Sequence, residues 1–70
     1  MIEISKIKPG DKVHYKPDFY GKDEAENGIV KEVSGNIGAF VVYKCDGNWD
    51  NYYDYTGQLT WAESLHYGWK

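Results

Sequence analysis

The sequence predicts a small all-β barrel of about five short antiparallel strands with one 3₁₀ turn, formed by residues 1–70 as a single domain. Three observations support this prediction. The chain has only 70 residues, which is enough for one domain. Several short segments alternate apolar and polar side chains, as half-buried strands do. Turn signals rich in Gly, Asn and Asp separate these segments, and closure into a barrel protects the strand edges.

The first half of the chain predicts three strands, at residues 11–16, 29–33 and 39–45. The first alternates, with Val13 and Tyr15 on one face. The third is continuously apolar and rich in β-branched and aromatic residues, which is typical of a central strand. A lead-in strand or a single helical turn is expected at residues 2–9. A polar loop is expected at residues 17–27 and a hairpin loop of about five residues at 34–38.

In the second half, apolar residues fall on odd positions and polar residues on even ones between residues 49 and 61. This parity predicts strand structure with one apolar face. The odd set comprises Trp49, Tyr53, Tyr55, Leu59 and Trp61. Residues 62–65 are expected to form the single 3₁₀ turn. Residues 66–69 are expected to form a last short strand, which either completes the barrel or docks on its outside.

Composition favours a folded, soluble protein. Hydrophobic residues make up 41% of the chain and aromatic residues 17%, too much for a disordered segment. The single cysteine, Cys45, forms no internal disulfide, so a reducing, cytoplasmic location is expected. No signal peptide is recognisable at the N-terminus. The longest apolar run, residues 39–43, is far shorter than the roughly 20 residues that span a bilayer.

The aromatic residues of the last third are the strongest functional lead. Ring faces attract cations, and neighbouring carboxylates add to that attraction. Two interpretations stay open, because the odd-numbered rings either form the core or contribute to a contact surface. Tyr52 breaks the parity and is expected on the exposed polar face beside Asp50 and Asp54. The predicted binding residues are Tyr52, Trp49, Asp50, Asp54, Tyr67 and Trp69.

Catalytic and metal chemistry find little support in the sequence. Asp46, Asp50 and Asp54 lack the close alternating spacing and the closing Glu of calcium loops, so we expect surface charges, no metal and no cofactor. Cys45 ends an apolar strand and is expected to be a small buried residue, although a nucleophile pair with a distant histidine stays open. No paired-carboxylate motif or Gly-rich phosphate loop is present. We therefore expect a protein that is not an enzyme.

The charge balance is unfavourable for a general phosphate binder. The net charge is −3, and all eight basic residues are lysines, whereas arginine is the better partner for phosphate. Five lysines give a local basic excess: Lys6, Lys8, Lys12, Lys16 and Lys70. With Tyr15, Phe19 and Tyr20 nearby they form a modest nucleic-acid patch, or they are strand-edge lysines that discourage aggregation.

Two segments resemble parts of known small barrels. Pro9-Gly10-Asp11-Lys12-Val13 followed by residues 28–33 resembles the opening hairpin of SH3-like barrels such as KOW and Tudor domains. Residues 53–57, YDYTG, with Leu65 after them resemble the later Tudor strands and their 3₁₀ turn. The whole chain also resembles a group of small phage and gut-bacterial proteins with no known activity, through GDKV, NGIVK, VVY, YTG and a final GW. The first resemblance implies an SH3-like barrel whose aromatics form a cage for a methylated cation or a groove for a peptide.

We therefore expect a non-catalytic binding module, foremost a protein-interaction domain of phage or prophage type. Its aromatic and acidic surface would face a basic or aromatic-rich protein partner, and the chain would be a monomer or a weak homo-oligomer. The alternative is a barrel that binds nucleic acid or a nucleotide. No membrane partner is expected.

Overall fold

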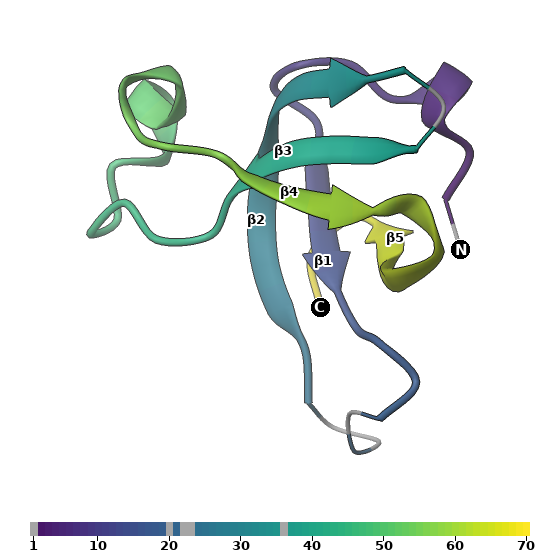
Figure 1. Cartoon of the computed structure of the whole chain (residues 1–70). Coiled ribbons are helices and arrows are strands. Elements are labelled where there is room, and N and C mark those ends of the chain that lie inside the picture. Colours follow the sequence, from purple (N-terminus) through teal and green to yellow (C-terminus); the bar gives the residue numbers. More distant parts are fainter. Residues whose placement is uncertain (1, 20, 22–23, 36) are drawn as a thin grey trace.

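A computed structural model shows five short strands in one antiparallel sheet of order β4-β3-β2-β1-β5 (Figure 1). It describes residues 2–19, 21, 24–35 and 37–70. The strands are β1 Lys12–Tyr15, β2 Glu26–Ser34, β3 Gly38–Val42, β4 Gln58–Trp61 and β5 Leu65–Tyr67. The 3₁₀ segments are η1 Ile4–Lys6, η2 Trp49–Asp54 and η3 Ala62–Ser64. The prediction of a small all-β, barrel-like fold is confirmed.

Parts of the sequence-based predictions fall outside these ranges. Tyr20, one of the aromatics near the basic excess, is among them, and so are residues 22, 23 and 36 of the two predicted loops.

The long strand β2 gives the sheet its curl. Its first half pairs with β1, from Lys12 opposite Ile29 to Tyr15 opposite Glu26. Its second half pairs with β3, and the register shifts between Val30 and Glu32. Such a bulge bends the strand that carries it. The strand β2 therefore connects the two halves of the curved sheet, one containing β1 and the other containing β3.

The core is aliphatic and is made by the strands together with the N-terminal segment. Eight buried residues form one cluster: Ile2, Ile4, Ile7, Val13, Val30, Ala39, Val41 and Leu65. Of the two alternatives for residues 2–9, the structure has the helical turn, η1. The backbone N–H of Ile2 donates to the carbonyl of Ala62 (3.3 Å). The first residues therefore cover the interior beside η3.

The strand predicted for residues 49–61 is mostly wrong. Residues 49–54 form η2, and only Gln58–Trp61 is strand. None of the five strands of the described residues pairs with residues 49–54. Local bonds serve their backbone instead, such as the N–H of Tyr55 to the carbonyl of Tyr52 (3.1 Å). The preceding turn has φ values of 53° at Asp46 and 82° at Gly47, which turns the chain away from β3.

The interpretation of the odd-numbered aromatics as core is therefore wrong. Tyr53 and Trp61 are 58% and 59% exposed, while Trp49 and Tyr55 are half-buried. In β4 the parity is reversed, because Thr60 is buried whereas Leu59 and Trp61 face outward. Aliphatic side chains already fill the interior, so it has little room for these large rings.

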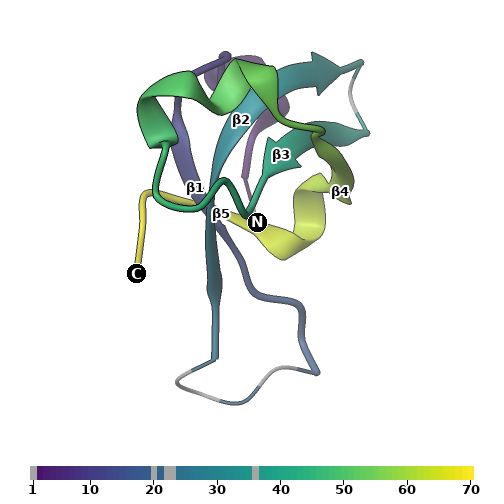
Figure 2. The same cartoon turned by 90° about the vertical axis from the view of Figure 1, so that its left-hand side faces the viewer.

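Three further buried apolar residues lie outside the core cluster: Ile29, Val42 and Cys45. Ile29 and Val42 are cross-strand partners. The segment η2 contacts β2 and lies over its upper part (Figure 2). Cys45 is also buried, as expected for a small apolar side chain.

The C-terminal residues extend the sheet instead of docking outside it. The strand β5 pairs with β1, so the predicted last strand is present. It ends at Tyr67, two residues before the predicted end at residue 69. The side chain of Asn27 holds the backbone of Lys70 through two hydrogen bonds, of 2.9 and 3.2 Å. The helical segments within the described ranges are all too short to be membrane-spanning.

Candidate functional site

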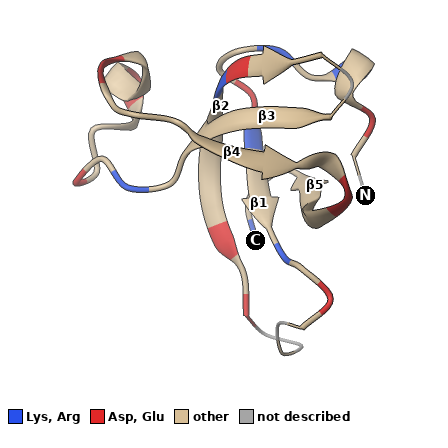
Figure 3. Cartoon of the chain, in the orientation of Figure 1, with Lys and Arg blue, Asp and Glu red and all other residues tan. Residues whose placement is uncertain are grey.

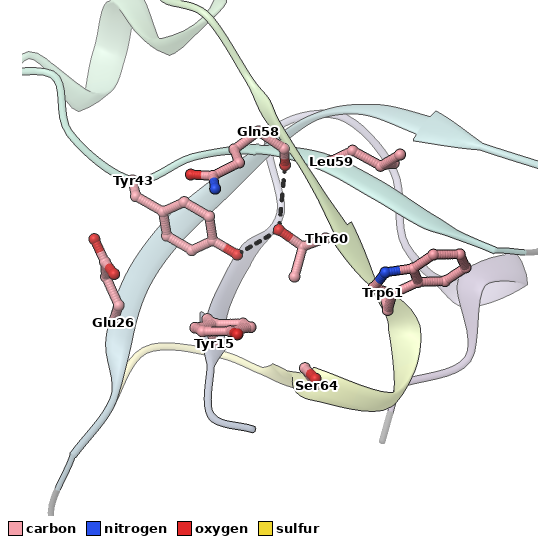
Figure 4. Close-up of a pocket in the computed structure, with 8 residues that line it drawn as sticks. All are labelled: Tyr15, Glu26, Tyr43, Gln58, Leu59, Thr60, Trp61 and Ser64. Carbon is pink, nitrogen blue, oxygen red and sulfur yellow. Dashed lines mark hydrogen bonds between the residues drawn. The ribbon is translucent and has the colours of Figure 1, made fainter. Parts of the chain in front are cut away.

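A hollow of about 250 Å³ lies between β4, the end of β1 and the start of β2 (Figure 4). We call it the β4 groove. Its lining residues are Tyr15, Glu26, Tyr43, Gln58, Leu59, Thr60, Trp61 and Ser64. They come from three strands (β1, β2 and β4), from the segment after β3 and from η3, so the curled sheet is what brings them together.

A short chain of hydrogen bonds sets the floor of the groove. The Tyr43 hydroxyl lies 2.8 Å from the Thr60 hydroxyl, which in turn donates to the carbonyl of Gln58 (3.2 Å). Tyr43 is therefore the donor to Thr60. Because both groups are partners, the buried Thr60 hydroxyl is satisfied.

Two tyrosine rings meet at this floor. The centroids of Tyr15 and Tyr43 lie 6.1 Å apart and the ring planes make an angle of 66°, a favourable edge arrangement. In Figure 4 the two rings lie near each other, with Trp61 across from them beyond Thr60. The groove is therefore walled by aromatic surface on two sides.

The groove is acidic at its β2 end. Glu26 is half-buried there, and no lysine within the described residues forms an ion pair with it. A neighbouring hollow shares Glu26, Tyr43 and Gln58 with the groove and adds Lys44. A half-buried carboxylate that no lysine of the described residues neutralises favours the arrival of a cation.

The opposite end of the groove is also bordered by carboxylates. Two further hollows meet it, one sharing Trp61 and the other sharing Ser64. Glu63 lines both of them, and Asp18 lines the second beside the exposed ring of Phe19. Together with Glu26, these carboxylates give the surroundings of the groove a negative potential.

The predicted binding residues Trp49 and Trp69 lie elsewhere and pack against each other. Their ring centroids are 4.9 Å apart in an edge arrangement. The Trp69 indole N–H donates to the carbonyl of Gly28 (2.8 Å). The ammonium of Lys12 lies 4.8 Å from the centroid of the Trp69 ring. These contacts give the two tryptophans a packing role on the outer face of the sheet.

The other predicted binding residues are scattered. Asp50 and Asp54 are exposed on η2. Tyr52, which was expected to be exposed, is half-buried. Its hydroxyl lies close to Gly10, since a Cβ added at that glycine would be 3.3 Å from it. Tyr67 is exposed on β5, where its hydroxyl accepts a hydrogen bond from the Glu3 N–H (3.0 Å). None of the six predicted residues lines the β4 groove.

Sequence reasoning missed the groove residues Glu26 and Tyr43. The strand prediction placed Tyr15 on the same face as Val13, which is correct. A tyrosine at the end of an apolar strand is a signal for a barrel mouth, since its ring packs inward while its hydroxyl needs a polar partner. Tyr15 and Tyr43 both have that position.

The basic excess is partly neutralised. Lys6 and Lys8 form ion pairs with Glu3 (3.5 Å) and Asp11 (3.4 Å). Lys12 lies over Trp69, as described above. These three lysines therefore already have partners within the chain.

His14 and His66 stack across β1 and β5, with centroids 5.2 Å apart and planes inclined by 20°. The Nδ1–H of His14 donates to the carbonyl of Gly68 (2.9 Å). Burial lowers the pKa of His66 from its ordinary value of 6.5, and neighbouring positive charges, including His14 and Lys16, lower it further. A backbone hydrogen bond at Lys16 opposes this shift only in part.

Comparison with protein-family models, with curated proteins and with solved structures finds no match for this chain. Within the described ranges, no three His, Cys, Asp or Glu side chains gather as metal ligands.

Proposed function

We propose that this protein is a non-catalytic interaction module that binds a basic segment of a partner protein in the β4 groove. One observation carries the proposal: the half-buried residue Glu26 lines the same hollow as the aromatic rings of Tyr15, Tyr43 and Trp61. Ring faces and a carboxylate in one small site together favour a cation. The resemblance to Tudor-like barrels supports the same kind of ligand.

The size of the groove fits a side chain better than a separate small molecule. Ligand pockets usually enclose about 300–1,000 Å³, whereas this groove has about 250 Å³ and is open. A lysine or arginine side chain would lay its apolar stem on the rings and bring its charge to Glu26. The net charge of −3 would favour the approach of a basic partner.

Fluorescence anisotropy with a labelled eight-residue peptide that alternates lysine and valine tests the proposal. We expect this peptide to bind and a glutamate–valine peptide of the same length not to bind. Glu26→Gln should weaken the lysine peptide by about fivefold, the usual effect of losing a partly exposed ion pair. Asp50→Asn is the matched control, because Asp50 is exposed on η2 outside the groove.

Three results would argue against the groove. Absence of binding at low salt removes the proposal. Weakening by Asp50→Asn but not by Glu26→Gln would move the site to η2. Tighter binding of single-stranded DNA or RNA than of the lysine peptide would favour the nucleic-acid alternative.

A further inference from the structure

We infer that the bound segment is extended and adds to the sheet as a sixth strand, along the free edge of β4. This binding mode rests on the proposed function, since it specifies the backbone conformation of the basic segment. The strand β4 is at one end of the order β4-β3-β2-β1-β5, and β3 is its only partner among the described residues. Its other edge borders the β4 groove, because all four of its residues line that hollow.

The register with β3 shows which backbone groups of β4 do not bond to β3. Trp61 lies opposite Gly38, and the N–H of Ala62 donates to the carbonyl of Ile37 (3.0 Å). In an antiparallel ladder this bond marks the Trp61–Gly38 pair as non-hydrogen-bonded. The N–H and C=O groups of Trp61, and by alternation those of Leu59, therefore point away from β3.

The Trp61 carbonyl is the N-cap group of η3 and is the acceptor that the first bond of this 3₁₀ turn uses. For the Trp61 N–H and for both backbone groups of Leu59, the described residues show no partner. Natural edge strands are commonly protected by charged residues or proline. The sequence of β4, QLTW, has neither, and Figure 3 shows no charged residue along it. The edge is therefore open to another extended chain.

The side chains of β4 specify what that chain should carry. Thr60 is buried at the floor of the groove, while Leu59 and Trp61, 47% and 59% exposed, form its outer rim, where Trp61 lies beside the exposed Ile37. An added strand presents alternate side chains to the two faces of the sheet. One set would enter the acidic groove near Glu26 and should be basic. The other set would lie beside Leu59 and Trp61 and should be apolar.

Charge selects a basic segment over a second copy of this chain. A second β4 would bring four uncharged residues to the edge, so no cation would reach Glu26. It would also bring a second set of carboxylates and another net charge of −3, which repel at short range. The segment we propose alternates basic and apolar residues over the length of β4.

The backbone at Trp61 allows a specific test on the protein. Its φ is −68°, the value that a proline ring imposes, and its N–H makes no bond to β3. Trp61→Pro should therefore keep the fold while removing an outward donor, and Trp61→Ala removes only the indole. We expect the lysine–valine peptide to bind Trp61→Pro about tenfold more weakly than Trp61→Ala. Unfolding in urea confirms that both variants are folded.

Two N-methylated forms of the peptide test the same point without altering the protein. In one form the backbone nitrogens of the lysines are methylated, and in the other the backbone nitrogens of the valines. Because the N–H groups of alternate residues point to opposite edges of an extended chain, each form blocks one edge of the peptide. We expect one form to bind within about twofold of the parent and the other to lose about tenfold or more.

The outcomes separate the two proposals. If the parent peptide binds but the two methylated forms behave alike, strand addition is wrong and the binding of a basic segment stands. If the parent peptide does not bind, the proposed function itself fails. If sedimentation equilibrium shows a dimer that Trp61→Pro dissociates, the edge belongs to a second copy and the inference is overturned.

Discussion

Replacing Trp69 by alanine should remove a large part of the stability of this protein, although this tryptophan follows the last strand of the sheet. The substitution removes the hydrogen bond to Gly28, the edge contact with Trp49 and the ring beneath the Lys12 ammonium. The crowding of aromatic residues in the last third of the sequence predicted a binding role for Trp69. The contacts of Trp69 with Gly28, Trp49 and Lys12 instead show that it packs on the outer face of the sheet.

The magnitude follows from burial. Trp69 is 37% exposed, so about 150 Å² of its side chain is buried, which contributes about 3–4 kcal/mol at about 25 cal/mol per Å². The hydrogen bond contributes about 1 kcal/mol. The area figure is an upper value because unfolded chains already bury some surface, so we expect a loss of about 3 kcal/mol. A domain of this length has a total stability of only about 4–10 kcal/mol.

Equilibrium unfolding in urea, followed by circular dichroism, measures this loss as a lower transition midpoint. The matched control is Trp61→Ala, because Trp61 is 59% exposed and its replacement should cost less than about 1 kcal/mol. A double-mutant cycle with Trp49→Ala should give a coupling of about 1 kcal/mol. Equal stabilities of the Trp69→Ala and Trp61→Ala proteins would refute the packing role of Trp69.

Three further changes probe other parts of the fold. Gly38→Ala should cost about 3 kcal/mol in urea unfolding, because its Cβ would lie 1.9 Å from the Thr60 carbonyl oxygen; a loss below about 1 kcal/mol would contradict this close approach. Thr60→Val should cost about 1 kcal/mol by removing the acceptor of the Tyr43 hydroxyl, and a stability equal to that of the parent would show that the bond is dispensable. Acid should destabilise the protein through His66. Its folded pKa is lowered, so the unfolded chain takes up the proton first, and stability is full above about pH 6.5 and falls as the pH drops below it. Melting temperatures at about pH 7.5 and pH 5.5 should differ less in His66→Gln, and an unchanged difference would remove His66 from this effect.

The sequence by itself determined the class of fold and several elements. Turn residues and β-branched runs are local signals, so β1, β3 and η3 were predicted close to their observed bounds. Cys45 was correctly expected to be buried. The strand β2 was predicted too short, because its first residues, Glu26 and Asn27, are polar and owe their extended form to pairing with β1.

Only the tertiary structure decided which faces are inside and where the groove lies. A strand shifted by one residue exchanges its two faces, and the 3₁₀ turns of η2 broke the parity between Trp49 and Trp61. The interior was filled by Ile2, Ile4 and the strand aliphatics, which sent the large rings to the surface. The β4 groove joins side chains up to 49 positions apart in the chain, from Tyr15 to Ser64, and no local pattern records such a meeting.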